Sequence, residues 1–315
     1  MRPRSTMAIF FAGAMCATVA AADAGSIESL NTGSAHEALF SVALSGHAGV
    51  AVGAAGQLLE SADAGAHWRP TTVPTDQALL GVDVNAGRAI AVGQAGVILV
   101  KGADGKWTRS ATDSTARLFA VHVNAAGLAV AVGAFGAVLE SKDGGKSWTS
   151  VSPKWDSFTD GDEPHLYGVD VADDGVITLA GEFGLILRST DAGASWTALH
   201  KGDTSLFGLD LRKDGNGYAV GQDGTVLKTA DRGATWQTVN VGTTANLLSV
   251  ASSESGTVYI TGMHELLSST DNGTTWQHRA AETSAEPWHA GIAMIGESTN
   301  AIAVGDFGQI VRLEK

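Results

Sequence analysis

The sequence predicts an all-β fold, a seven-bladed β-propeller of four-stranded antiparallel blades, and three observations predict it. An apolar strand that ends in glycine recurs seven times, and a Gly-x-x-Gly turn follows most copies of that strand. The sequence contains 40 glycines but only six prolines in 315 residues, which favours many short strands joined by tight turns. Beyond the first residues, no stretch shows the apolar periodicity of a helix.

The repeated strand sets the number of blades. Successive copies are separated by about 42 residues, which is the length of a four-stranded propeller blade. The copies end at Gly53, Gly93, Gly133, Gly181, Gly221, Gly262 and Gly305.

Each copy contains the same four strands in the same order. The first alternates apolar and polar residues, as in "LFAVHV" at residues 118–123, and the glycine-ended strand is the second. The Gly-x-x-Gly turn, for example "GAFG" at residues 133–136, leads into a third strand. A polar turn then leads into a fourth strand, which we expect to begin at a tryptophan.

The seventh copy stops after its third strand, at the end of the chain. An unfilled fourth position would leave a sheet edge exposed, and residues 26–31 can supply the missing strand. We therefore expect one closed domain over residues 23–315, completed by an N-terminal strand.

The first 22 residues resemble a secretory signal peptide, with a basic start and a short apolar run. We expect cleavage after Ala22, with Ala21 and Ala24 as alternatives, and a retained N-terminal anchor is the other interpretation. These features predict an exported, periplasmic protein of a Gram-negative bacterium. Cys16, the only cysteine, lies in the segment to be removed, so no disulfide is expected.

Composition and motifs restrict the function. A formal charge of −13 argues against nucleic acid and anionic lipid as partners, because both reward basic patches. The sequence has neither a phosphate-binding Gly-x-x-x-x-Gly-Lys loop nor paired histidines at metal-ligand spacing. We expect no cofactor and a monomer that does not insert into the membrane after signal cleavage.

The polar turn carries a motif, Ser/Thr-x-Asp-x-Gly-x-x-Trp, which resembles the Asp-box of sialidase-like propellers (BNR-type repeats). A short carboxylate accepts hydrogen bonds from its own turn, and a tryptophan buries a large ring between blades. We therefore expect these residues to be structural. They are Asp63 and Trp68, Asp143 and Trp148, Asp191 and Trp196, Asp231 and Trp236, and Asp271 and Trp276.

The wider unit, such as "VGAFGAVLESKDGGKSW" at residues 132–148, resembles the repeat of the photosystem II stability and assembly factor family. The resemblance covers essentially the whole expected mature chain. It implies a seven-bladed, non-enzymatic, exported propeller that assists the assembly or function of a membrane-protein complex. We expect the partner to be a periplasmic segment of a membrane protein or membrane complex.

The alternative is a carbohydrate-active propeller, either a glycoside hydrolase or a lectin related to sialidases. Sialidase chemistry needs an arginine cluster, a nucleophilic tyrosine and acid/base carboxylates. Tyr167, Tyr218 and Tyr259 all lie inside strand patterns, and the sequence shows no arginine cluster. We therefore predict no catalytic residue and no enzymatic activity.

Partner binding is expected on the loop face, which bears the Gly-x-x-Gly turns and the connections between blades. The regular repeat breaks on this face, and loops carry function in such scaffolds. The candidates are Trp155 and Phe158 in an insert, the turn residues Phe135, Phe183, Phe307, His264 and Glu265, and Trp288 and His289 in a connection.

The aromatic and acidic character of this face suits a basic or amphipathic protein segment. We expect Trp155 and Phe158 to be exposed, because the insert exceeds what a blade needs. For the turn phenylalanines and Trp288, packing against a neighbouring blade remains an open alternative. Asp156, Asp160 and Asp162 in the insert could instead bind calcium, which prefers clustered oxygen ligands.

Overall fold

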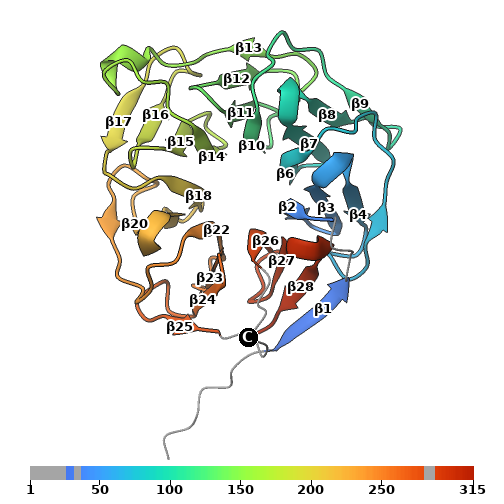
Figure 1. Ribbon diagram of the computed structural model, residues 1–315, viewed down its shortest axis with the longest axis vertical. Helices are drawn as coiled ribbons and strands as arrows, with labels where there is room; N and C mark the ends of the chain where they lie inside the picture. The colour runs from blue at the N-terminus through green and yellow to red at the C-terminus, as the bar shows by residue number, and fades with distance from the viewer. Residues whose placement is uncertain (1–25, 32–36, 280–287) are drawn as a thin grey trace, which may run out of the picture.

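The computed structural model describes residues 26–31, 37–279 and 288–315, which form seven four-stranded antiparallel sheets arranged in a ring (Figure 1). This architecture confirms the predicted all-β seven-bladed propeller. Blade 1 comprises β2 (Leu39–Ser45), β3 (Ala48–Gly53), β4 (Leu58–Ser61) and β5 (Arg69–Pro70). Blade 2 comprises β6 (Leu79–Asn85), β7 (Arg88–Gly93), β8 (Ile98–Lys101) and β9 (Trp107–Arg109).

The next four blades repeat this pattern. Blade 3 comprises β10 (Leu118–Val123), β11 (Ala129–Gly133), β12 (Val138–Ser141) and β13 (Thr149–Ser150). Blade 4 comprises β14 (Leu166–Val171), β15 (Ile177–Gly181), β16 (Ile186–Ser189) and β17 (Thr197–His200). Blade 5 comprises β18 (Leu206–Leu211), β19 (Gly217–Gly221), β20 (Val226–Thr229) and β21 (Gln237–Thr238). Blade 6 comprises β22 (Leu247–Ser252), β23 (Val258–Gly262), β24 (Glu265–Ser269) and β25 (Gln277–His278).

Blade 7 joins the two ends of the chain. It contains β26 (His289–Met294), β27 (Ala301–Gly305) and β28 (Ile310–Leu313), and its outermost strand is β1 (Ile27–Asn31). β1 pairs antiparallel with β28, with Ile27 opposite Leu313, and Figure 1 shows the two strands side by side. The expected signal segment lies outside the described residues.

The core lies between neighbouring sheets. In one cluster, Ile90 and Val92 of blade 2 pack with Val121, Leu139 and Trp148 of blade 3. Each second strand has a strand on both sides and a sheet against both faces, so β11 is buried along its whole length. This explains why the second strand is a continuous apolar run rather than an alternating one.

Every first strand carries a β-bulge at the same place. The pairing register shifts between the first and third residues of β2, β6, β10, β14, β18, β22 and β26. A bulge inserts one extra residue and redirects its side chain. In this fold that extra residue faces the central channel.

Within the described residues, the helical segments are five short 3-10 turns: η1 (Ala54–Gly56), η2 (Gln94–Gly96), η3 (Trp155–Ser157), η4 (Gln222–Gly224) and η5 (Asp306–Gly308). Within the described ranges, no helix is long and apolar enough to span a membrane. The expected start of the fourth strand was wrong by one residue in most blades, because it begins after the tryptophan everywhere except at Trp107.

Candidate binding cleft on the loop face

The two faces of the ring are built from different connections. On one, the turn between the third and fourth strands contacts the loop between the first and second strands, as when the Gly144 amide donates to the Gly127 carbonyl at 3.0 Å. On the loop face, the turn between the second and third strands contacts the next connection between blades. There the Gly136 amide donates to the Pro164 carbonyl at 2.8 Å.

A left-handed residue projects from every second-to-third-strand turn on the loop face. These residues have φ between 51° and 60°, and they are Ala55, Ala95, Phe135, Phe183, Asp223, His264 and Phe307. Left-handed backbone is uncommon for residues other than glycine, so its recurrence reflects the shared turn geometry. This geometry exposes Phe135 by 70%, Phe183 by 44% and Phe307 by 47%.

The loop face collects exposed apolar surface. Of the five large apolar side chains that are exposed in the described part of the chain, Phe135, Phe183, Met263 and Phe307 lie on this face. The fifth is Ile27 on β1. Concentration on one face marks a candidate interaction surface, whereas single scattered residues would not. The three phenylalanines are thus exposed, although the Phe135 ring also contacts His165 at the start of blade 4.

A collar of aromatic and aliphatic side chains surrounds the loop-face mouth of the central channel. It consists of the bulge residues Phe40, Leu80, Phe119, Tyr167, Phe207, Leu248 and Ala290, all of which line the channel and are half-buried. Tyr167 touches both neighbours, with centroid distances of 5.2 Å to Phe119 and 5.2 Å to Phe207. Phe40 stacks on Trp288 at 6.4 Å.

The residue after each collar position is small because neighbouring first strands approach closely there. These residues are Ser41, Gly81, Ala120, Gly168, Gly208, Ser249 and Gly291. A Cβ atom on Gly81 would lie 2.7 Å from the Phe119 carbonyl oxygen of the next blade. Small residues thus let the strands close the ring while the collar side chains stay at its mouth.

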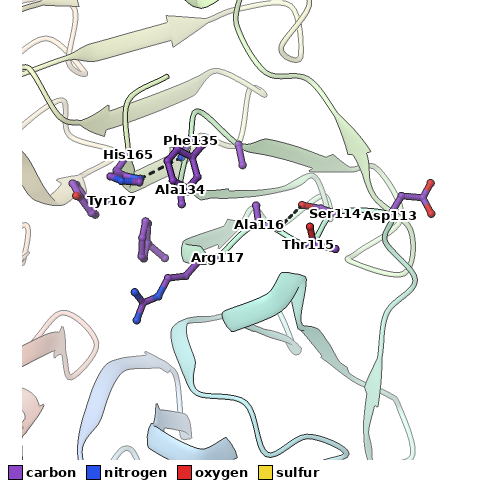
Figure 2. A pocket seen from close by; sticks show the side chains of 11 residues that line it. Asp113, Ser114, Thr115, Ala116, Arg117, Ala134, Phe135, His165 and Tyr167 are labelled. Carbon is purple, nitrogen blue, oxygen red and sulfur yellow. Dashed lines mark hydrogen bonds between the residues drawn. The ribbon is translucent and has the colours of Figure 1, made fainter. Parts of the chain in front are cut away.

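A cleft of about 1070 Å³ joins the collar on the loop face, where blades 3 and 4 meet (Figure 2). Its aromatic wall contains Phe119, Phe135, His165 and Tyr167, and the His165 ring lies 5.0 Å from the Phe135 ring. Arg117 lies beside them, with its guanidinium carbon 5.7 Å from the Phe119 centroid. The connection from Asp113 to Arg117 forms the other wall.

Hydrogen bonds to Glu182 hold the aromatic wall in position. Glu182 accepts the His165 backbone amide at 2.8 Å and the Tyr167 hydroxyl at 3.5 Å. Burial, followed by the charge of Glu182, raises the pKa of Tyr167 to about 12. The phenol therefore stays protonated at neutral pH and acts as a hydrogen-bond donor, not as an activated nucleophile.

The predicted exposure of Trp155 was wrong. Its side chain is only 7% exposed and packs in the core between blades 3 and 4 with Leu166 and Leu185. The indole lies against Gly136, where a Cβ atom would come 2.0 Å from its Nε1. Moving so large an apolar ring out of water into the core lowers the free energy of the folded state. The insert therefore contributes a core residue to this junction.

Other candidates are also less accessible than expected. Phe158 is half-buried against the same core, and its carbonyl accepts the Lys201 Nζ at 2.6 Å. Glu265 faces His278, with 3.1 Å between Oε1 and Nδ1. His289 begins β26 instead of lying in a connection, and burial lowers its pKa to about 4. His264 is exposed, whereas Trp288 is half-buried.

The calcium alternative finds no support. Across the described residues, which include Asp156, Asp160 and Asp162, no group of three or more His, Cys, Asp or Glu is placed to hold a metal ion.

The aspartate turns lie on the face opposite the cleft. In blade 3, Asp143 accepts the Ser147 amide at 3.0 Å and the Ser147 hydroxyl at 2.6 Å. The Ser141 hydroxyl accepts the Gly145 amide at 2.8 Å, and the Trp148 Nε1 donates to the Gly145 carbonyl at 2.9 Å. A Cβ on Gly145 would lie 2.8 Å from Ile90 of blade 2, so the turn packs on the preceding blade.

The collar was not predicted. Phe40, Phe119 and Phe207 were not among the candidate residues, and Tyr167 was placed only within a strand pattern. The available signal was a pair of adjacent apolar residues at the start of most first strands, as in "LF", "LL" and "LY". Strict alternation forbids such a pair, so its repetition indicates the bulge.

These features define a seven-bladed β-propeller with an aromatic cleft beside its channel mouth. No family model and no curated protein matches the sequence. The chain is similar to a structure of YCF48 bound to a D1 peptide, with a TM-score of 0.72 and 18% identity over 93% of this chain and 96% of that chain.

Two enzymes share the fold. A catalytically inactive virginiamycin B lyase from Staphylococcus aureus with quinupristin has a TM-score of 0.71 and 12% identity, over 92% of this chain and 99% of that chain. The GH74 xyloglucanase from Xanthomonas campestris has a TM-score of 0.70 and 16% identity, over 90% of this chain and 53% of that chain. Such low identities show the fold alone, which hosts both binding proteins and enzymes.

Proposed function

We propose that this protein is an exported, non-catalytic, monomeric propeller that binds a periplasmic polypeptide segment of a membrane-protein complex and assists its assembly or function. The observation that carries the proposal is the cleft between blades 3 and 4, where the exposed ring of Phe135 stands beside Phe119, His165 and Tyr167. Aromatic side chains in a concave surface dominate the energetics of protein interfaces.

The chemistry of the cleft suits an amphipathic segment. Apolar side chains of the segment pack on the collar. Polar groups of the segment face Arg117, Asp113 and the hydroxyl end of Tyr167. The similar YCF48 structure holds a D1 peptide, which supports a polypeptide as the class of ligand. An exported location is supported by the signal-like start of the sequence.

The test is affinity capture of membrane proteins with purified protein and a Phe135→Ala variant. This substitution removes the exposed ring without straining the turn, because Ala55 and Ala95 occupy the same left-handed position in blades 1 and 2. We expect unfolding free energy to change by no more than about 0.5 kcal/mol, as at other surface positions. We also expect partner recovery to fall about tenfold or more, the loss for an aromatic interface residue.

Ile27→Ala is the control, because Ile27 is also a large exposed apolar side chain but lies on β1 instead of the loop face. Recovery of the same membrane protein by wild type and Phe135→Ala would contradict the proposal. A glycan array and a panel of fluorogenic glycosides test the carbohydrate-active alternative. Turnover that is abolished by one carboxylate substitution would replace our assignment with that of a glycoside hydrolase.

A further inference from the structure

Two histidines accept hydrogen bonds from backbone amides across the junction between blades 3 and 4. His122 on β10 accepts the Val171 amide of blade 4 on Nδ1 at 2.7 Å. His165, which precedes β14, accepts the Phe135 amide of blade 3 on Nδ1 at 3.2 Å. A backbone N–H can only donate, so both rings must be neutral at Nδ1 and carry their proton on Nε2.

His122 lies among carboxylates of neighbouring blades. Its Nε2 is 3.7 Å from Asp83 on β6, and its Nδ1 is 3.4 Å from Asp170 on β14. Asp210 on β18 and Asp173 beyond β14 add negative charge at longer range. Burial opposes protonation, but these four aspartates outweigh it and raise the pKa of His122. Burial raises the pKa of Asp170, but its carboxyl keeps an acceptor oxygen near Nδ1 in either protonation state, so a protonated Nδ1 can donate to it.

His165 occupies the wall of the cleft itself. The rings of Phe119, Phe135 and Tyr167 surround its imidazole, and Figure 2 shows its bond to the Phe135 backbone. The charged groups near it are Glu182, behind the strand, and Arg117 and Asp113 across the cleft. Its hydrogen bond holds the turn that presents Phe135.

A neighbouring junction makes the same kind of contact without histidine. Asp83 occupies the position of His122 in blade 2, and its Oδ2 accepts the Val123 amide of blade 3 at 2.8 Å. A carboxyl group keeps an acceptor oxygen in either protonation state, whereas an imidazole Nδ1 loses its only lone pair when it is protonated. This junction therefore provides a non-switching comparison within the same molecule.

We propose that the junction between blades 3 and 4 is a proton-operated clasp. Protonation of Nδ1 removes the lone pair that accepts the Val171 amide at His122 or the Phe135 amide at His165. His122 then donates to Asp170, the turn of Phe135 is released, and the cleft loses its fixed shape. The clasp itself is inferred from the hydrogen-bond geometry. The further expectation, weaker binding of the polypeptide segment at acidic pH, rests on the function proposed above.

Amide hydrogen exchange measured by NMR between about pH 5 and pH 8 tests the clasp. After correction for intrinsic exchange rates, we expect protection of Val171 and Phe135 to fall about tenfold on acidification, as for one lost hydrogen bond. Protection of Val123 should stay constant. His122→Asn and His165→Asn keep an acceptor near the position of Nδ1 but do not titrate, so the matching amide should become insensitive to pH.

Two results would overturn the clasp: protection of Val171 and Phe135 that follows Val123 at every pH, or an unchanged pH response in both asparagine variants. Capture of the membrane protein at both pH values provides a separate readout. A clasp that responds to pH in a protein that captures no partner contradicts only the proposed function. Capture that persists unchanged at acidic pH while the amides respond contradicts only the coupling between them.

Discussion

Phe135 and Trp155 lie close together in the structure but have opposite environments. Phe135 is 70% exposed because its left-handed backbone directs the ring out of the turn. Trp155 is 7% exposed because the adjacent Gly136 leaves room for its indole. One residue therefore offers binding surface, whereas the other stabilises the blades that position that surface.

This difference predicts opposite effects of the two alanine substitutions. Trp155→Ala should lower the free energy of unfolding by about 3–5 kcal/mol, because it leaves a cavity between blades 3 and 4. Phe135→Ala should leave it unchanged within about 0.5 kcal/mol. Equilibrium urea unfolding of both variants measures the difference. Equal stability of the two variants would show that Trp155 does not hold the junction.

Among the elements, the first strand of each blade combines two tasks. Its bulge places one side chain in the collar, which is large in every blade except blade 7, and the following small residue lets neighbouring strands approach. The other repeated element, the aspartate turn, packs its glycine on the preceding blade. Collar and aspartate turns thus occupy opposite ends of the blades, which separates the candidate binding surface from the contacts that support the ring.

The sequence predicted the elements better than the site. Glycine-ended apolar strands are local signals, so the second strands and their turns could be recognised without tertiary information. The burial of Trp155 depends on its contact with Gly136, which lies on another turn, and no local pattern shows that contact. The cleft was only partly predicted: Phe135 was identified, but Phe119 and Tyr167 were not, because a bulge changes the face that a strand residue occupies.

The aspartate turns predict an acid-sensitive contribution to stability. The hydroxyl and amide of Thr275 lower the pKa of Asp271 to about 2, below the value of about 3.9 for an unfolded aspartate. A carboxyl with a lowered folded-state pKa contributes stability above the unfolded pKa and loses it as pH falls towards the folded one. Wild-type stability should therefore decrease between about pH 4 and pH 2, and Asp271→Asn should weaken this decrease.

Urea unfolding at several pH values measures how steeply the unfolding free energy falls with pH in this window. Asp113→Asn serves as the control, because Asp113 is an exposed aspartate on the loop face. If Asp271→Asn retained the full wild-type slope, the turn hydrogen bonds would not be the source of the acid sensitivity.

At the scale of the whole molecule, the ring depends on its two chain ends. β1 closes blade 7 by pairing with β28, and the Ser26 carbonyl accepts the Glu314 amide at 2.9 Å beyond the ladder. Without β1, the β28 edge would be unpaired and open to association with other chains. The closed ring in turn fixes the seven first strands that form the collar.

Deletion of Ile27–Asn31 should therefore destabilise the protein and promote aggregation. Each ladder hydrogen bond lost removes about 0.5–1.5 kcal/mol, so the total loss should reach several kcal/mol. Thermal unfolding and light scattering measure both effects. A circular permutant that places β1 directly after β28 should recover the wild-type behaviour, whereas a deletion variant as stable as wild type would contradict closure by this strand.

We propose that the cleft between blades 3 and 4 binds a polypeptide segment of a membrane protein. Site-specific photo-crosslinking in intact cells tests it most directly, with the photoreactive residue placed at Phe135 or at His67. His67 is 83% exposed and belongs to an aspartate turn on the opposite face. We expect position 135 to crosslink to one identifiable membrane-protein segment and position 67 to give no such crosslink. Equal crosslinking from both positions, or crosslinking from position 67 alone, would contradict it.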